Sequence, residues 1–284
     1  MFRSINQLYL APYNRAHPFF AIYRFIAWKY IRLFKLTNVS FPVWGNRKIR
    51  LHYDNSQSCW IMYNYWVDWE EFNLIRNLLN PDDVVFDIGA NIGSYTIWMS
   101  KFIGSNGTIH SFEPDESSFN RLKSNVNLNK IHSYVSLNKL AISDSGERRR
   151  FTSSKDVENH LTVKGDISGL EIDCTTIDQY VYEHDIKHIK FIKMDIEGFE
   201  YFALNGASKT LKDNKVDVIQ LEINSRVRNS NSSINQILVL IEQSNYTLCA
   251  FNVKTRKFKP AIFSPTRENY FMVNRNFIKF DSNG

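Results

Sequence analysis

A chain of 284 residues, 43% hydrophobic and 23% charged, can bury one large α/β core and has the composition of a globular protein rather than a disordered one. Its net charge of +6 is uneven, because residues 1–50 hold nine Lys or Arg and no Asp or Glu, whereas the rest holds 26 basic and 29 acidic residues. This distribution argues against a nucleic-acid groove across the whole protein, and three scattered cysteines without a CxxC pair predict neither a metal site nor a disulfide framework.

An aromatic and basic region, 1–80, comes first, and we expect it to pack on or lead into the domain that follows. Within it, Phe19–Lys35 predicts a helix with basic side chains in one arc and large apolar side chains opposite. The basic residues are Arg24, Lys29, Arg32 and Lys35, and the apolar ones are Phe20, Ile22, Tyr23, Ile26, Tyr30, Ile31, Leu33 and Phe34. The pattern fits a helix lying on an anionic membrane, and it also fits a helix packed on the core or on a dimer partner. The sequence leaves these alternatives and the oligomeric state open.

No uncharged apolar run approaches the ~18 residues of a membrane-spanning helix. The first ten residues also lack the pattern of a signal peptide. We therefore expect a cytoplasmic protein, with any membrane contact peripheral and at the inner face.

Residues 81–284 alternate short apolar runs with helical patterns, as the βαβ units of a parallel sheet do. We predict strands at Val84–Ile88, Thr108–Phe112, Leu137–Ile142, Phe191–Met194 and Val216–Glu222. Helices are predicted at Tyr95–Phe102, Glu116–Asn127, Thr176–Tyr182, Phe199–Leu211 and Ile234–Gln243, the last followed by two β-rich runs. The stretch Glu147–Cys174 is less regular and predicts extra hairpin strands at one edge.

A glycine-containing turn follows the first of these strands, where the chain reads Asp87-Ile-Gly-Ala-Asn-Ile-Gly93. Gly89 permits a tight turn, and Gly93 lets the start of the next helix approach the sheet and a ligand closely. The N–H groups at that helix start favour a phosphate or a carboxylate. Taken alone, the motif also fits a structural turn in an unrelated α/β protein.

Acidic residues end the next two predicted strands. Glu113 lies about 20 residues beyond Gly93, where a carboxylate can accept hydrogen bonds from both hydroxyls of a ribose. Asp144 fits a contact with the amino group of an adenine whose ring Ile142 covers, and it fits equally an ordinary turn before Gly146.

Two carboxylates, Asp195 and Glu197, stand two residues apart where the fourth strand gives way to a helix. Helix capping would account for one of them, so the pair favours a functional role. Glu222 closes the fifth strand. Because the carboxyl ends of parallel strands share one edge of a sheet, we expect the acids and the glycine turn to gather in one ligand crevice.

This ordered set of motifs resembles the FkbM-type methyltransferases. The segments that carry the resemblance are Val85–Gly93, Phe112–Pro114, Asn125–Asn129, Ala141–Asp144, Thr176–Asp178, Ile192–Glu200 and Leu204–Ala207. The resemblance implies a class I methyltransferase Rossmann-like α/β fold: a mostly parallel seven-stranded sheet with one antiparallel strand and helices on both faces. It implies S-adenosylmethionine as the methyl donor and a hydroxyl oxygen as the acceptor, on a glycan or small molecule, which places the chain in glycan biosynthesis.

The resemblance also implies roles by position. The implied donor-binding residues are Asp87, Gly89, Asn91, Gly93, Glu113, Ile142, Asp144 and Asp195. Asp195 would also stand near the acceptor as the catalytic base, with Glu197 and Glu222 as further catalytic candidates.

Other functions stay open on the sequence. An NAD-dependent oxidoreductase shares the glycine turn and the ribose carboxylate, but the glycine spacing is not GxGxxG and the Asp195–Gly198 element has no role there. A nucleic-acid methyltransferase would suit the positive charge, but enzymes that methylate base amines commonly carry an Asn/Asp-Pro-Pro-aromatic element where this chain has Asp195-Ile-Glu. A binding protein that has kept the pocket without turnover is a third possibility.

Overall fold

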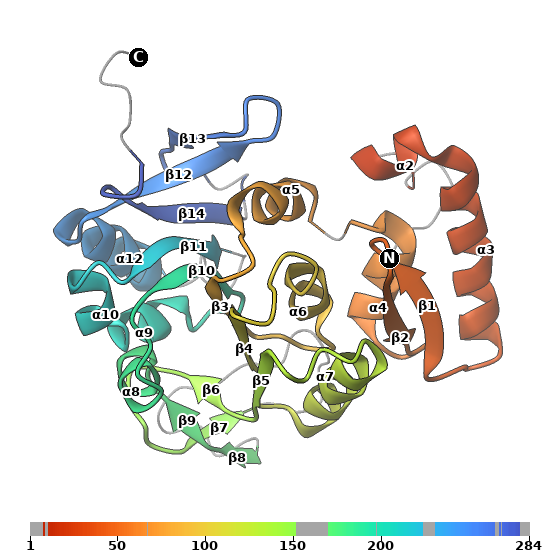
Figure 1. Ribbon diagram of the computed structural model, residues 1–284, viewed down its shortest axis with the longest axis horizontal. Coiled ribbons are helices and arrows are strands. Elements are labelled where there is room, and N and C mark those ends of the chain that lie inside the picture. Colours follow the sequence, from red (N-terminus) through yellow and green to blue (C-terminus); the bar gives the residue numbers. More distant parts are fainter. Residues whose placement is uncertain are drawn as a thin grey trace.

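The computed structural model describes Leu8, 11–66, 68–151, 170–196, 198–223, 231–264, Arg267 and 269–278. The described helices are α2 (Pro12–Ala16), α3 (Pro18–Leu33), α4 (Ser56–Asn64), α5 (Trp69–Leu78), α6 (Ser94–Met99), α7 (Glu116–Leu128), α8 (Ile177–Glu183), α9 (Glu200–Asn205), α10 (Ser208–Lys212) and α12 (Asn231–Gln243) (Figure 1). The strands are β1 (Val39–Val43), β2 (Arg47–Leu51), β3 (Val84–Ile88), β4 (Thr108–Phe112), β5 (Val135–Asn138), β6 (Ala141–Ile142), β7 (Arg149–Phe151), β8 (Leu170–Ile172), β9 (Cys174–Thr175), β10 (Ile189–Met194), β11 (Val216–Glu222), β12 (Tyr246–Asn252), β13 (Lys257–Pro260) and β14 (Asn269–Asn274). Within these described ranges, every helix is too short or too polar to cross a membrane.

An eight-stranded sheet in the order β13-β12-β14-β11-β10-β3-β4-β5 forms the centre of the molecule. The strands from β11 to β5 are parallel, and β14 runs antiparallel between β11 and β12. This is the mostly parallel α/β sheet that the sequence predicts. One strand more is present than expected, because the chain turns back after β12 and adds β13 antiparallel at the edge.

Alternate residues of the central strands face opposite sides of the sheet, which gives the protein two hydrophobic layers. Val85 and Phe191 pack in one layer with α5, α6, α7 and the N-terminal region. Phe86 and Ile192 pack in the other layer with α8, α9, α10 and α12. Figure 1 shows these two sets of helices on opposite faces of the sheet. Because both faces are covered, the strands read in the sequence as nearly continuous apolar runs.

Two predicted elements are split. The strand predicted at Leu137–Ile142 is β5 followed by β6, and β6 leaves the main sheet to pair with β9. The helix predicted at Phe199–Leu211 is α9 followed by α10, and the break falls at Gly206, where a Cβ would lie 2.1 Å from the carbonyl oxygen of Ser143. The hairpin strands expected within Glu147–Cys174 are present as β7 and β8, and residues 152–169 lie outside the described part.

The N-terminal region packs against the α7 side of the sheet. Asn129, which follows the last residue of α7, donates to the carbonyl of Lys48 at 2.7 Å and accepts from its N–H at 2.8 Å, and Asn125 Oδ1 on α7 accepts from the N–H of Arg50 at 2.7 Å. Side chains from this region, including Trp44, share the hydrophobic layer with α6. These contacts agree with an extension packed on the core, and a domain boundary at residue 80 stays a prediction.

Helix α3 packs through the side that the sequence places in its basic arc. Its buried residues are Ala21, Arg24, Trp28 and Ile31. Arg24, which the sequence places in the basic arc, is buried: its Nε donates to the carbonyl of Met62 at 3.1 Å, and its guanidinium also donates to Asn14 Oδ1. On the apolar side of α3, Tyr23, Ile26 and Leu33 face outward, whereas Ile31 is buried.

Candidate active site

The turn between β3 and α6 runs against the segment that follows β10. Gly89 and Gly93 have φ of +76° and +93°, and Asn91 between them has φ of +50°, so the turn uses the left-handed region that favours glycine. A Cβ on Gly89 would lie 1.9 Å from the carbonyl oxygen of Asp195. Gly89 therefore allows the backbone of the turn to touch the neighbouring strand end, whereas Gly93 allows the start of α6 to approach Leu122 of α7.

A row of polar side chains crosses four strands at the carboxyl edge of the sheet. Ser111 on β4 pairs in register with Asp87 on β3, Asp87 pairs with Lys193 on β10, and Lys193 pairs with Gln220 on β11. Partners in register point to the same face, here the face covered by α6. Four of the central strands thus each place a polar residue in one line under α6.

Lys193 is the centre of this row. It is 2% exposed, its Nζ donates to the carbonyl of Gly89 at 2.8 Å, and it lies 3.3 Å from Asp195 Oδ2 and 3.9 Å from Asp87 Oδ1. Burial alone would lower the pKa of a lysine, but the carboxylates of Asp195, Asp87 and Glu222 together raise the pKa of Lys193 above its ordinary value. The residue is a buried ammonium that ties the glycine turn to two strand ends.

Asp87 is fully buried beside this ammonium. One of its oxygens accepts from the hydroxyl of Thr96, which also contacts the hydroxyl of Ser111 at 2.8 Å. Burial raises the pKa of Asp87, and the charge of Lys193 opposes that rise. Its other oxygen has no hydrogen-bond partner among the described residues.

A second group of side chains, made up of Tyr95 of α6 with Asp68 and Glu71, adjoins the row. The Tyr95 hydroxyl donates to Asp68 at 2.6 Å and accepts from Gln220 Nε2 at 3.1 Å, and Lys193 Nζ lies 5.3 Å from the centre of the Tyr95 ring. Burial, together with the nearby Asp68, raises the pKa of Glu71 to about 8. The N-terminal region therefore contributes side chains to the site.

Glu113 sits at the end of β4, where the sequence predicts a ribose-binding carboxylate. It is 6% exposed and accepts from the N–H of Asn91 at 2.8 Å and from the N–H of Asp115 at 2.9 Å. Burial raises the pKa of Glu113 to about 7, although the two N–H donors oppose the rise. The carboxyl group thus lies directly beside the glycine turn.

The two predicted adenine contacts lie on β6 and just after it. Ile142 is 1% exposed and packs within the hydrophobic layer under α8 and α9, and Asp144 forms an ion pair with Arg149. A hydrogen bond from the donor's adenine to Asp144 would compete with this ion pair. The adenine-binding roles of Ile142 and Asp144 stay predictions.

The segment after β10 carries the predicted catalytic acids. The Asp195 side chain is 28% exposed, and its N–H donates to the carbonyl of Ile88 at 3.2 Å. Glu222 ends β11 and is half-buried, whereas Glu197 lies outside the described residues. The structure thus brings Asp195, Glu222 and the glycine turn to one edge.

Glu200 is a site residue that the sequence reasoning did not single out. Its Oε1 accepts from the N–H of Ile196 at 3.2 Å and of Gly198 at 3.3 Å, so its carboxyl group lies next to the residue that follows Asp195. Burial raises the pKa of Glu200 to about 7. The sequence reasoning did not single out Lys193 either, although it is the one charged residue of the predicted strand Phe191–Met194.

Other motif residues hold the fold together. Thr176 caps α8 by accepting from the N–H of Gln179 at 3.0 Å, and Asp178 accepts from Lys209 and Thr210 N–H groups at 2.9 and 2.7 Å at the start of α10. Asn125 donates to the carbonyl of Ile92 at 2.8 Å and so supports the glycine turn from behind. These residues serve structure rather than chemistry.

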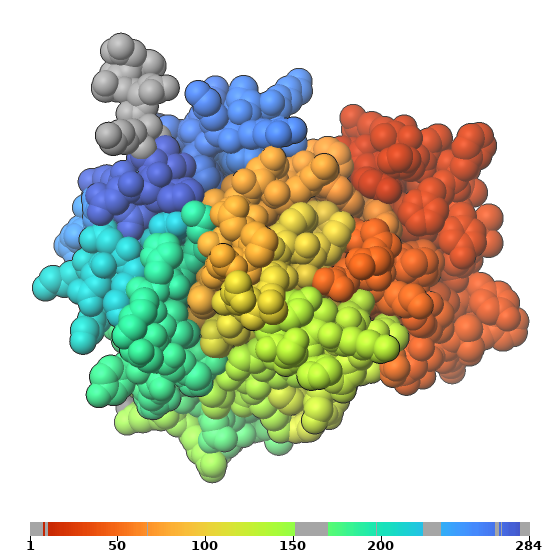
Figure 2. All heavy atoms as spheres, viewed as in Figure 1, coloured from red at the N-terminus to blue at the C-terminus, as the bar shows by residue number. Residues whose placement is uncertain are grey.

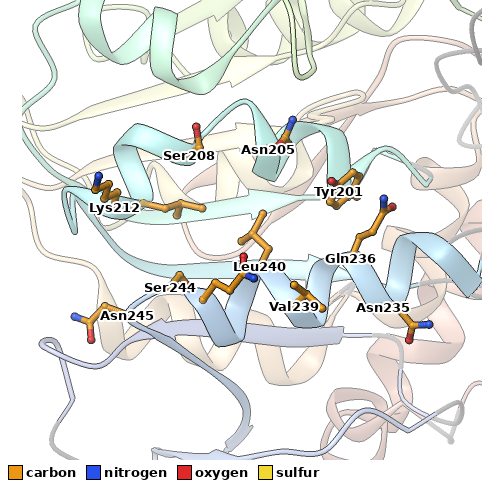
Figure 3. A pocket seen from close by; sticks show the side chains of 12 residues that line it. Tyr201, Asn205, Ser208, Lys212, Asn235, Gln236, Val239, Leu240, Ser244 and Asn245 are labelled. Atoms are coloured by element: carbon orange, nitrogen blue, oxygen red, sulfur yellow. The ribbon is translucent and has the colours of Figure 1, made fainter.

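A cavity of about 620 Å³ lies elsewhere, between α9, α10 and α12 (Figure 3). Tyr201, Asn205, Leu240 and Asn245 are among its lining residues, and the described part of the lining has no Asp, Glu, His or Cys. It lies on the α12 side of the sheet, opposite the face under α6 that carries Lys193. This cavity is therefore separate from the site.

Comparison with known proteins agrees with the arrangement. A methyltransferase FkbM domain matches residues 87–248. The chain is 26% identical over 160 residues to the hexuronic acid methyltransferase AglP of Haloferax volcanii, covering 55% of this chain and 64% of that protein. It is 36% identical over 74 residues to the 31-O-demethyl-FK506 methyltransferase FkbM of Streptomyces tacrolimicus, covering 26% and 27%. The matched part thus spans less than two thirds of either relative.

Among solved structures, a methyltransferase FkbM from Methylobacillus flagellatus KT aligns with 19% identity and a TM-score of 0.46, over 69% of this chain and 44% of that one. The domain match alone covers more than half of the chain and includes the glycine turn, Glu113, Lys193 and Asp195. The chain belongs to the FkbM family of S-adenosylmethionine-dependent methyltransferases.

Proposed function

We propose that this chain transfers a methyl group from S-adenosylmethionine to a hydroxyl oxygen of a sugar, a glycan or a related small molecule. The observation that carries the proposal is the partly exposed carboxylate of Asp195, held by Lys193 directly beside the glycine turn. The name of the Haloferax relative, a hexuronic acid methyltransferase, supports a sugar as the acceptor.

The residues around the glycine turn fit an adenosyl sulfonium donor. Asp87 has a buried oxygen without a hydrogen-bond partner among the described residues, which suits the amino group of the donor. Gly89 and Gly93 leave the backbone of the turn open to a ligand, and Glu113 beside Asn91 would hold the ribose. When bound, S-adenosylmethionine supplies a methyl group carried by a positively charged sulfur.

Asp195 would remove the proton from the acceptor. A neutral hydroxyl must lose its proton as its oxygen gains the methyl group, and a carboxylate within hydrogen-bond reach can take that proton. Lys193 holds one Asp195 oxygen at 3.3 Å, which leaves the other available to a hydroxyl group. Glu222, at the end of the neighbouring strand β11, would orient the acceptor. Glu197 would support Asp195 as a further catalytic candidate. Fixing both reactants at one edge of the sheet and excluding water supplies the rest of the rate enhancement.

The family membership argues against the NAD-dependent oxidoreductase considered on the sequence. Calorimetry of the purified chain with S-adenosylhomocysteine and with NAD separates the two functions directly. We expect binding of S-adenosylhomocysteine and none of NAD.

The acceptor class is tested with free and nucleotide-linked hexoses and hexuronic acids, each beside its fully O-methylated form as a blocked control. We expect release of S-adenosylhomocysteine, and a mass gain of one methyl group, only with the unblocked sugars. Transfer to an amine or to RNA instead, or equal release with the blocked sugars, would contradict hydroxyl methylation.

A further inference from the structure

We propose that the outward side of α3 docks this protein onto the surface of an anionic lipid membrane. Six large side chains, which we call the outer α3 face, line that side at spacings of three and four residues and at the end of the helix. They are Phe19, Tyr23, Ile26, Tyr30, Leu33 and Phe34, exposed by 86%, 55%, 61%, 56%, 75% and 56%. In Figure 1, α3 forms the right-hand edge of the molecule, opposite α10 and α12, and Figure 2 shows the N-terminal residues at that end. A continuous apolar stripe at the rim of a protein marks an interaction surface.

The opposite side of α3 holds this stripe in its outward orientation. Ala21, Trp28 and Ile31 are buried against the protein, and Arg24 between them is fully buried. Its guanidinium lies 4.5 Å from the ring of Phe20 and 5.0 Å from the ring of Tyr65, in addition to its hydrogen bonds to Met62 and Asn14. Turning the outer α3 face inward would break these contacts and expose Trp28 and Ile31 to water. The apolar stripe is therefore a fixed feature of the fold.

The charge around the outer α3 face favours an anionic partner. Arg15, Lys29, Arg32 and Lys35 are exposed on or next to α3. No Asp or Glu precedes Asp54 in the sequence, so this segment carries a net positive charge. Aromatic and aliphatic side chains on one side with basic residues beside them are the combination by which a helix lies in the interface of an anionic bilayer. The described helices do not cross a membrane, so the contact is peripheral.

A second copy of the chain fits this face less well. A two-fold contact would place each outer α3 face against itself and bring Lys29 and its neighbours close to their own counterparts. The first 53 residues offer no carboxylate to pair with them. The stripe also covers only Phe19–Phe34, shorter than the three or four heptads that sustain a coiled coil. Charge complementarity thus selects the membrane.

The test uses the full chain in flotation assays with vesicles of phosphatidylcholine alone and of phosphatidylcholine mixed with phosphatidylglycerol. We expect binding to the mixed vesicles, weakened by added salt, and little binding to the neutral ones. The triple variant Phe19→Ser, Ile26→Ser, Leu33→Ser should lower the partition coefficient about tenfold or more. The variant Lys29→Gln, Lys35→Gln should reduce binding to the mixed vesicles only.

Matched controls change the same number of exposed residues elsewhere. Leu170→Ser, Tyr182→Ser and Ile262→Ser replace side chains exposed by 62%, 83% and 92%, and Lys254→Gln with Lys257→Gln removes two exposed charges from the β12–β13 hairpin. Both controls should bind vesicles as the wild-type chain does, and circular dichroism should show all variants folded.

Three results would overturn the proposal. The first is no binding of the wild-type chain to the mixed vesicles, and the second is an equal loss in the outer-face variant and its control. The third is a dimer in sedimentation equilibrium that the outer-face variant dissociates while its vesicle binding is unchanged, which would assign the face to a second copy.

Discussion

Lys193 on β10 lies directly opposite Asp87 on β3 in the register of the sheet, with its Nζ 3.9 Å from Asp87 Oδ1. The same ammonium donates to the carbonyl of Gly89 at 2.8 Å and lies 3.3 Å from Asp195. One buried charge therefore joins the first core strand, the glycine turn and the proposed base. Its loss would leave two carboxylates at the strand ends without their cation.

We expect Lys193→Met to destabilise the protein and weaken donor binding together. Removing one member of a buried charge group typically costs about 3–5 kcal/mol, because the remaining charge is left unpaired. The free energy of unfolding in urea measures the first effect, and calorimetry with S-adenosylhomocysteine measures the second. Lys190→Met is the control. Lys190 lies on the same strand and also pairs with a carboxylate, Asp217, at 2.9 Å, but its side chain is 15% exposed and lies away from the glycine turn. Equal losses in the two variants would contradict the role assigned to Lys193.

Asp195→Asn should lower kcat by about 10²- to 10⁴-fold, the usual contribution of a general base. The amide keeps the size of the side chain, so the affinity for S-adenosylhomocysteine should change little. Single-turnover assays and calorimetry separate the two quantities. Asp185→Asn, at a carboxylate exposed by 82%, should leave both unchanged. Full turnover in Asp195→Asn would exclude this residue as the base.

The sheet and the acids at its edge could be predicted from the sequence because both depend on local patterns. The predicted bounds of β3, β4 and β11 agree with the structure, since each is a short apolar run that ends at a Gly or an acidic residue. The split between β5 and β6 could not be predicted, because β6 pairs with β9, and β9 follows a long insertion in the sequence.

The interior of the site was harder to predict because its contacts join distant segments. The Tyr95 hydroxyl forms hydrogen bonds to Asp68 and Gln220, which lie far from it along the chain. No spacing in the sequence signals these contacts. Lys193 reads as a solvent-facing residue until the register shows it in line with Asp87. A helical wheel likewise separates the two sides of α3 but does not say which one packs. Charged side chains usually lie on the exposed side of a helix, whereas Arg24 is buried.

Gly89→Ala should abolish donor binding and destabilise the fold, whereas Gly45→Ala should cost only about 1–2 kcal/mol. Both glycines have positive φ, +76° and +83°, so both variants carry the same backbone strain. The added Cβ differs: at Gly89 it would lie 1.9 Å from a backbone oxygen of Asp195, but at Gly45 its nearest neighbour is the flexible end of Lys101 at 3.4 Å. Thermal unfolding and calorimetry with S-adenosylhomocysteine should therefore separate the two variants. Similar behaviour would show that the close approach at Gly89 is unimportant.

The buried carboxyl groups predict that stability falls as the pH rises to about 8. Burial raises the pKa of Glu71 to about 8 from an ordinary value of 4.5, so between these values the native state keeps a proton that the unfolded chain has released. Glu113 and Glu200, raised to about 7, act in the same direction. His52 and His110, whose pKa burial lowers to about 4, act in the opposite direction but only below their ordinary 6.5.

The window from pH 6.5 to about 8 therefore isolates the carboxyl groups, and Glu71 dominates its upper part. We expect the Tm of the wild-type chain to decrease across this window, and Glu71→Gln to remove up to roughly 2 kcal/mol of the loss, at about 1.4 kcal/mol for each pH unit. The amide cannot ionise, so its stability should stay nearly constant where that of the carboxyl group declines. Glu183→Gln, on the exposed side of α8, should follow the wild-type curve. A wild-type Tm that rises over the same window, or an unchanged slope in Glu71→Gln, would show that Glu71 is ionised in the folded protein at neutral pH.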